Sequence, residues 1–203
     1  MKYLKIILPF VFICLLSSSF RGPGNNRNGD QHPLFSVEMS TLGKETFQLG
    51  KIKGKGIVIV VMSPECPLSR SYTLTINKLS EKYSRKGIRF YAIFPGKELS
   101  VMDVVEFQRK YKLHPEVLLD NSYKMVDQLH ATVTPEAFLI DSYGGIKYQG
   151  AIDNWVYSLT KKRQVITKHY LEDAIQSMVT GFPLEYEQTQ PIGCFINAPV
   201  YGN

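Results

Sequence analysis

One short stretch of the sequence constrains the fold more than any other. Residues 57–62 read Ile-Val-Ile-Val-Val-Met, a continuous apolar and mostly β-branched run that ends at Ser63-Pro64. Such a run predicts a strand buried on both faces, as in the middle of a parallel or mixed sheet. Pro67 suits the first turn of a helix, and a helical spacing of apolar residues follows it at Leu68, Tyr72, Ile76, Leu79 and Tyr83. The sequence therefore predicts a strand followed directly by a helix, with Cys66 at the junction.

Strand and helix patterns alternate through the rest of the chain. We expect strands at 35–39, 46–49, 88–94, 117–119, 137–140 and 146–148, and helices at 100–111, 123–129 and 167–179. The turn Ser142-Tyr-Gly-Gly145 joins the last two strands as a hairpin. This order of elements predicts an α/β sandwich with a mixed sheet.

The two ends of the chain differ from this folded part. Residues 1–19 have the pattern of a secretory signal, with two lysines, an apolar run and then three serines. Residues 20–33 are expected to form a flexible leader, because they are rich in Gly, Asn and Pro and have little to bury. The domain is expected at 34–180, with a C-terminal tail at 181–203 that carries Cys194. Residues 184–203 of this tail are expected to be irregular, because they are rich in Gln, Glu, Tyr and Pro. The signal indicates export to a bacterial periplasm or cell envelope; an uncleaved N-terminal membrane anchor is the alternative.

Composition and charge exclude several classes of function. The chain is 44% hydrophobic and 21% charged, which is ordinary for a globular protein. Its formal net charge is +6, but the sequence has no basic stripe that would indicate nucleic-acid binding. The histidines are scattered without a metal-ligand spacing, so no stable metal site is expected; they are His32, His114, His130 and His169.

The cysteines are the residues most informative about chemistry. Cys14 falls within the signal, which leaves Cys66 and Cys194 in an exported and therefore oxidising setting. At a strand-to-helix junction, backbone N–H groups and the helix dipole stabilise a thiolate at Cys66. Arg70 adds positive charge one turn further on, whereas Glu65 opposes ionisation. The alternative is that Cys66 is a small buried apolar residue without reactivity.

Four segments together resemble one family. They are Val60 to Arg70 around the cysteine, Phe107 to Asp120, Thr134 to Gly150, and Tyr148 to Asn154 together with the late Gly193-Cys194-Phe-Ile196. This combination resembles the redoxin branch of the thioredoxin-like superfamily, which holds the alkyl hydroperoxide reductase/thiol-specific antioxidant proteins and their exported thioredoxin-like relatives. The resemblance implies a thioredoxin-like three-layer sandwich with a mixed central sheet and flanking helices. It also implies a thiol chemistry that needs no cofactor.

The resemblance assigns expected roles to particular residues. Cys66 stands at the position of the catalytic cysteine, and Thr134-Pro135 resembles the cis-proline loop that faces it and binds substrate. Ser63, Ser69 and Arg70 are the candidates for tuning the thiolate. Ser69 stands where a CxxC pair has its second cysteine, so Cys194 is the only internal candidate for a resolving thiol.

The expected function is an exported thiol-disulfide oxidoreductase that acts on a protein or small-molecule disulfide and is regenerated by an external thiol reductant. A peroxiredoxin-like peroxidase acting on a hydroperoxide is an alternative, although Ile59 stands where such enzymes have a proline. A non-catalytic module that binds a partner is a third possibility. The sequence leaves open whether Cys66 and Cys194 form a catalytic disulfide, form a permanent one, or remain unpaired.

Overall fold

The computed structural model describes residues 32–51 and 54–197. The expected signal at 1–19 and residues 20–31 of the expected leader lie outside the described residues. Within the described part of the chain, no helix is both long enough and apolar enough to cross a membrane.

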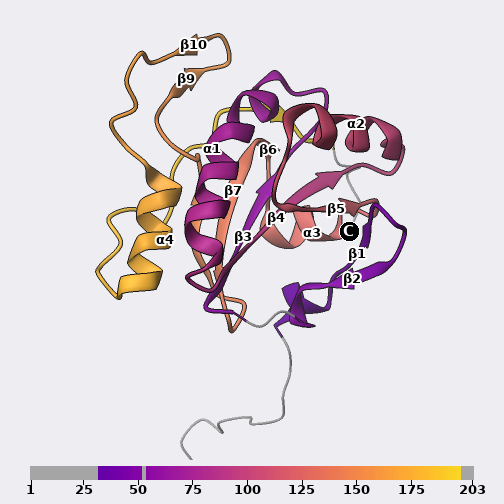
Figure 1. The fold of residues 1–203 in the computed structure, drawn as a ribbon, viewed down its shortest axis with the longest axis horizontal. Coiled ribbons are helices and arrows are strands. Elements are labelled where there is room, and N and C mark those ends of the chain that lie inside the picture. The colour runs from indigo at the N-terminus through magenta and orange to yellow at the C-terminus, as the bar shows by residue number, and fades with distance from the viewer. Residues whose placement is uncertain (1–31, 52–53, 198–203) are drawn as a thin grey trace, which may run out of the picture. The chain divides into compact units, whose positions relative to one another are not determined.

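A seven-stranded mixed sheet forms the centre of the fold (Figure 1). Its strand order is β2-β1-β5-β4-β3-β7-β8, in which β3, β4 and β5 are parallel and the other pairings are antiparallel. The strands are β1 (Glu38–Thr41), β2 (Thr46–Gln48), β3 (Gly56–Val61), β4 (Ile88–Pro95), β5 (Glu116–Asp120), β7 (Glu136–Asp141) and β8 (Ile146–Gly150). The run that the sequence predicts as a doubly buried strand is β3, at the centre of the sheet and buried at every position. The predicted mixed sheet is therefore confirmed.

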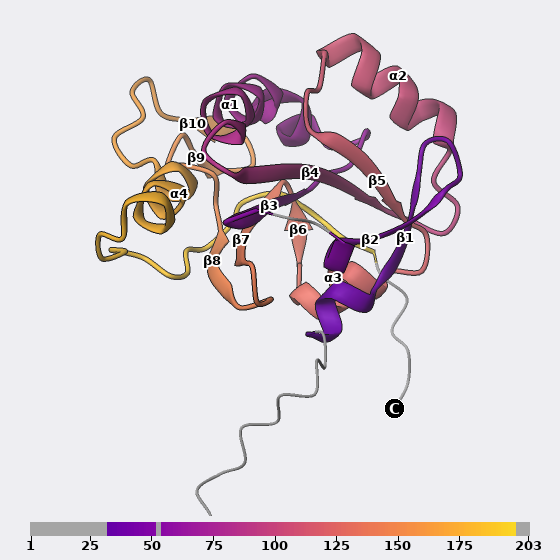
Figure 2. The same ribbon diagram turned by 60° about the horizontal axis from the view of Figure 1, so that its bottom comes forward.

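Helices cover both faces of this sheet (Figure 2). On one face Val58 and Val60 pack against α1 (Pro67–Ser84), α2 (Val101–Tyr111) and α4 (Tyr170–Thr180). On the other face Ile57, Ile59 and Val61 pack against α3 (Lys124–Leu129) and the short 3₁₀ segment Pro33–Ser36. Because successive residues of a strand point to opposite faces, the unbroken apolar run of β3 serves two separate cores. The predicted three-layer sandwich is thus confirmed.

Two elements begin three residues later than the sequence predicts, whereas the other expected starts lie within one residue. Residues 35–39 were expected to begin the first strand, but Pro33 starts a 3₁₀ turn that buries Leu34 and Phe35, so the strand begins at Glu38. The last helix was expected from residue 167 and begins at Tyr170. The backbone N–H groups of residues 167 and 168 instead donate to the Asn154 side chain, at 3.0 and 3.2 Å, which holds that segment in a non-helical turn.

Two small two-stranded sheets have no counterpart in the sequence expectation. The strand β9 (Val156–Ser158) pairs with β10 (Lys161–Lys162), and β6 (Val133–Thr134) pairs with β11 (Cys194–Phe195). The second pairing joins the C-terminal tail to the loop that precedes β7. The expectation of an irregular tail is therefore wrong for this stretch, because its backbone forms an antiparallel ladder with β6.

Candidate active site around Cys66

The strand-to-helix junction places Cys66 as the sequence predicts. Cys66 is the N-cap residue of α1, in an extended conformation, and Pro67 occupies the first turn of the helix. The side chain is 1% exposed and lies in the core cluster beneath α1. A thiol at this position faces the unpaired backbone N–H groups of the first helical turn, which favours its ionised form.

The loop before β7 lies directly against this thiol. The peptide bond between Thr134 and Pro135 is cis, as the family resemblance implies. The Cys66 thiol donates a hydrogen bond to the Thr134 carbonyl oxygen at 2.9 Å. The buried Glu136 carboxylate fixes the loop by accepting from the backbone N–H groups of Thr132, at 2.8 Å, and Val133, at 3.3 Å. Hydrogen bonds from the backbone of the loop to a buried carboxylate therefore hold the loop in place.

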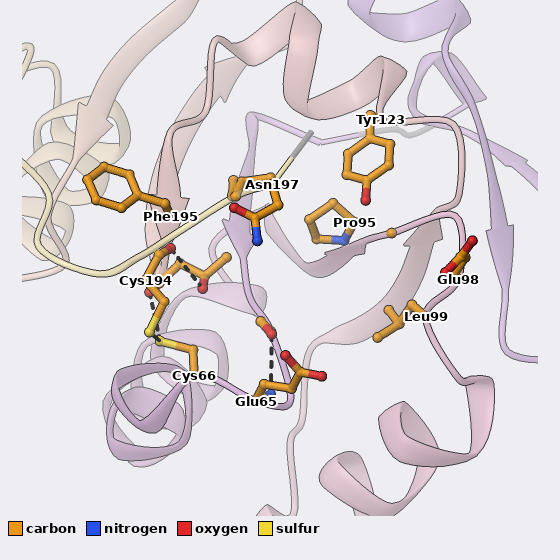
Figure 3. A pocket seen from close by; sticks show the side chains of 13 residues that line it. Glu65, Cys66, Pro95, Glu98, Leu99, Tyr123, Cys194, Phe195 and Asn197 are labelled. Carbon is orange, nitrogen blue, oxygen red and sulfur yellow. Dashed lines mark hydrogen bonds between the residues drawn. The ribbon is translucent and has the colours of Figure 1, made fainter. Parts of the chain in front are cut away.

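The tail brings the second cysteine to the same place. In the β6–β11 ladder Cys194 is opposite Thr134, and the Ile196 N–H donates to the Thr132 carbonyl at 3.0 Å. The Cys194 thiol donates to the Cys66 sulfur, and the two sulfurs are 2.6 Å apart (Figure 3). Both cysteines are free thiols. Two cysteines that are 128 residues apart in sequence therefore form one dithiol site.

Two glycines allow the tail to approach this closely. A Cβ atom on Gly193 would overlap the Thr134 carbonyl, and one on Gly150 would overlap the backbone of Thr189. Gly150 also has a φ of +135°, which side chains rarely tolerate. The Thr189 hydroxyl accepts from the Ala151 N–H at 3.0 Å and contacts the Tyr148 hydroxyl at 2.6 Å. The tail therefore packs closely against the domain at two points, Gly193 against Thr134 and Thr189 against Gly150.

The two thiols differ in acidity. Burial acts to raise the pKa of Cys66, but hydrogen bonds from the Cys194 thiol and the Ser69 backbone N–H outweigh it, so that the pKa lies below its ordinary value. Burial raises the pKa of Cys194 to about 11, and its hydrogen bond to Cys66 acts in the same direction. Cys66 is therefore the more acidic of the two thiols. On ionisation it loses its hydrogen bond to the Thr134 carbonyl oxygen and keeps the one that it accepts from Cys194.

The side chains of the other expected tuning residues lie near Cys66 and form hydrogen bonds with the local backbone. The Ser69 hydroxyl accepts from the Ser63 N–H at 3.1 Å, so its hydrogen bond stabilises the turn before α1. The Ser63 hydroxyl accepts from the Glu65 N–H at 3.2 Å, and Arg70 Nη2 donates to the Glu65 carbonyl at 3.5 Å. A role for Ser63, Ser69 and Arg70 in tuning the thiolate stays a prediction.

A pocket of about 660 Å³ opens beside the two sulfurs (Figure 3). It lies where the carboxyl ends of the parallel strands β3, β4 and β5 meet, the usual place for a ligand in such sheets. Besides Cys66, Thr134 and Cys194 it is lined by Ser63, Glu65, Pro95, Gly96, Glu98, Leu99, Tyr123, Phe195, Ile196 and Asn197. Most of these residues were not predicted as site residues. The order of parallel strands could have indicated the segments after β4 and β5, but nothing local in the sequence marks the residues after Cys194.

The structure shows no cluster that would bind a metal in its described part. Within residues 32–51 and 54–197, no group of three or more His, Cys, Asp or Glu side chains is placed to hold an ion.

Comparison with known proteins agrees with this geometry. The thiol-disulfide oxidoreductase ResA of Bacillus cereus is 25% identical over 143 residues, which are 70% of this chain and 80% of that protein. A hypothetical protein from Sinorhizobium meliloti 1021 superposes with a TM-score of 0.70 at 20% identity, covering 81% of this chain and 91% of that one. A secreted Mycobacterium tuberculosis disulfide oxidoreductase superposes with a TM-score of 0.52 at 15% identity, covering 73% and 98%. The two structures share the fold. The Redoxin family profile matches residues 27–160, about two thirds of the sequence, and the chain therefore belongs to the Redoxin family.

Proposed function

We propose that this protein is a thiol-disulfide oxidoreductase in which Cys66 is the attacking sulfur and Cys194 is the resolving sulfur. The observation that carries the proposal is the apposition of these two thiols across 128 residues of sequence, at 2.6 Å. Membership of the Redoxin family and the similarity to a thiol-disulfide oxidoreductase support the same chemistry.

The reaction takes place in two exchanges. The Cys66 thiolate attacks a substrate disulfide, which releases one substrate thiolate and leaves a mixed disulfide on Cys66. Cys194 then loses its proton to solvent and attacks the Cys66 sulfur, which releases the second substrate thiolate. The substrate gains two electrons, and the protein is left with a Cys66–Cys194 disulfide. Because Cys66 is 1% exposed with the tail docked, the first exchange requires Cys194 to move aside.

A disulfide substrate fits the site better than a hydroperoxide. The peroxidases of the family carry a Thr or Ser hydroxyl three residues before the reacting cysteine. Ser63 stands at that position, but its hydroxyl accepts from the Glu65 N–H at 3.2 Å. Ile59 is fully buried in the middle of β3, where the family's peroxidases have a proline. Peroxidase activity therefore stays the second candidate.

Turnover requires a thiol reductant from outside the chain, since the described residues hold only this one pair of cysteines. The signal-like pattern of residues 1–19 supports a location outside the cytoplasm, in a bacterial periplasm or cell envelope. Sequencing the N-terminus of the protein recovered from a periplasmic fraction tests this. A start after residue 19 supports export with cleavage, and an intact N-terminus in the membrane fraction supports the anchor.

Turnover of a model disulfide by three variants tests the proposal. Cys66→Ser is expected to abolish it, because the nucleophile is lost. Cys194→Ser is expected to perform the first exchange and accumulate a mixed disulfide on Cys66, because nothing resolves it. As a control, Tyr143→Ser changes a side chain that is 85% exposed in a hairpin turn and should leave the rate unchanged. Turnover that survives Cys66→Ser would contradict the proposal, and a wild-type protein without turnover would favour a non-catalytic module that binds a partner.

A further inference from the structure

Access to the two sulfurs is unequal while the tail is docked. Cys66 is 1% exposed, because the Thr134–Pro135 loop and β11 cover it, whereas Cys194 is only partly buried. Thiol-disulfide exchange depends on which sulfur an attacking thiolate can reach. In the docked arrangement, Cys194 is the more exposed of the two residues.

The shape of the site also limits what can approach. The strand β11 already pairs with Val133 and Thr134, so an extended peptide cannot add to this edge while the tail is in place. The pocket beside Cys194 remains open, and its volume of about 660 Å³ suits a small molecule. In Figure 3 Leu99, Glu98 and Tyr123 lie across the pocket from the sulfurs.

We infer that a low-molecular-weight thiol enters this pocket and attacks the Cys194 sulfur of the oxidised pair, so that Cys66 is the leaving group. The inference rests on the proposed function, which supplies the Cys66–Cys194 disulfide. It names the class of reductant, the pocket that admits it and the sulfur on which its mixed disulfide forms.

Atoms and electrons balance over two successive exchanges. The incoming thiol loses its proton to solvent, and its thiolate forms a bond to the Cys194 sulfur while the Cys194–Cys66 bond breaks. Cys66 leaves as a thiolate. A second molecule of the thiol then attacks the small-molecule sulfur of the mixed disulfide, which releases a small disulfide and a Cys194 thiolate that takes up a proton. Two thiols are oxidised, and the protein gains two electrons.

The surroundings of the two sulfurs favour attack at Cys194 with Cys66 as the leaving group. A thiol with the lower pKa is the better leaving group in such an exchange. The Ser69 N–H in the first turn of α1 stabilises a thiolate at Cys66, whereas burial and the contact with Cys66 disfavour one at Cys194. Attack at Cys194 therefore expels the sulfur that better bears the negative charge.

Mapping the first adduct tests the inference. The protein is oxidised to its internal disulfide, mixed briefly with cysteamine, quenched at short times with excess N-ethylmaleimide, acidified, and digested without reduction. Cysteamine suits the pocket because its ammonium group complements the carboxylates of Glu65 and Glu98. We expect cysteamine on the Cys194 peptide and N-ethylmaleimide on the Cys66 peptide at the shortest times. The reverse distribution overturns the inference and leaves the proposed function intact.

A pair of variants tests whether the thiol reaches Cys194 through this pocket. Leu99→Trp places an indole in the pocket, and Val105→Trp places the same group on the exposed side of α2, outside the pocket lining. Because access limits the exchange, Leu99→Trp is expected to slow reduction by cysteamine about tenfold, and Val105→Trp to leave it unchanged. Equal rates for both variants overturn the inference. A protein that forms no Cys66–Cys194 bond under a mild oxidant overturns the proposed function and the inference together.

Discussion

At the level of single residues, the chemistry of this site depends on a difference between two neighbouring thiols. Cys66 caps a helix and accepts hydrogen bonds, so its pKa lies below the ordinary value despite burial. Burial, together with the hydrogen bond that it donates to Cys66, raises the pKa of Cys194 to about 11. Each thiol therefore sets the protonation state of the other.

Two substitutions at Cys194 separate the two effects of this residue on the pKa of Cys66. One effect is the hydrogen bond that Cys194 donates, and the other is the burial of Cys66. Cys194→Ser keeps a donor beside the Cys66 sulfur, whereas Cys194→Ala removes it. We expect a higher pKa for Cys66 in the alanine variant than in the serine variant, because only the serine hydroxyl stabilises the thiolate. The pH dependence of iodoacetamide alkylation measures both values. Identical profiles would contradict a role for the hydrogen bond from residue 194.

At the level of elements, the site depends on a short strand pair that the sequence did not predict. The position of Cys66 follows from local patterns, because an apolar strand, a proline and a helical spacing are adjacent in sequence. The pairing of β6 with β11 spans only two residues on each strand and joins segments that are 60 residues apart. Such a pairing depends on close backbone approach at Gly193 rather than on an alternating pattern, so it leaves little trace in the sequence.

The variant Gly193→Val tests whether the pairing of β11 with β6 depends on the close approach at residue 193. The new side chain would overlap the Thr134 carbonyl, so the strand β11 is expected to leave β6 and to separate the two cysteines. Formation of the Cys66–Cys194 disulfide under a fixed glutathione redox buffer should fall sharply, while the far-ultraviolet circular dichroism stays that of the folded domain. Gly43→Ala is the control, because its new methyl group meets only the Thr41 hydroxyl at 3.6 Å. Unchanged disulfide formation in Gly193→Val would contradict the claim that the β6–β11 pairing brings the two cysteines together.

The β7–β8 hairpin gives a prediction that is independent of the cysteines. Asp141 accepts from the N–H groups of Tyr143, at 2.8 Å, and Gly145, at 2.9 Å, and pairs with Lys147 at 3.1 Å. Burial acts to raise its pKa, but the ion pair with Lys147 and the two backbone hydrogen bonds lower it below the ordinary value of 3.8. Asp141→Ala is expected to cost about 1–2 kcal/mol in the free energy of unfolding at neutral pH.

The pH dependence of that cost follows from the direction of the shift. A carboxyl whose pKa is lower in the folded state stabilises the fold above pH 3.8, and loses this contribution as the pH falls through the folded-state value. Denaturant unfolding of both proteins should therefore show the difference shrinking in acid. Asp141→Asn keeps an oxygen for the two N–H groups and is expected to be less destabilised at neutral pH than Asp141→Ala. A difference between wild type and Asp141→Ala that does not change with pH would contradict this account.

At the level of the whole molecule, the redox state of the pair and the stability of the fold are linked. A bond between cysteines that are 128 residues apart closes a loop around most of the domain. On the chain-entropy account such a loop stabilises the folded state by up to about 5 kcal/mol. The oxidised protein is therefore expected to unfold at a clearly higher denaturant concentration than the reduced protein. The Cys66→Ser/Cys194→Ser double variant should show no such dependence, and equal stability of the two wild-type forms would contradict the prediction.

The sequence predicts the architecture and the position of Cys66, but it does not predict how the tail brings Cys194 to the site. Strand and helix patterns predicted the order of elements, and the sheet and its two helical layers are as expected. The tail from residue 184 to 203 is expected from the sequence to be irregular, because it is rich in Gln, Glu, Tyr and Pro. Its path depends on contacts such as that of Thr189 with Gly150, which are made only once the sheet exists. Long-range docking of this kind is a property of the folded molecule rather than of any segment.

The most direct test of the central claim is a redox titration of the pair. The purified protein is equilibrated in buffers of graded reduced to oxidised dithiothreitol, alkylated without reduction, and digested for mass spectrometry. We expect one linked species, Cys66 joined to Cys194, which forms and disappears reversibly as the ratio changes. If Cys66 remains fully alkylated under every oxidising condition, or if the linked species resists every reducing buffer, then the two cysteines are not a redox pair.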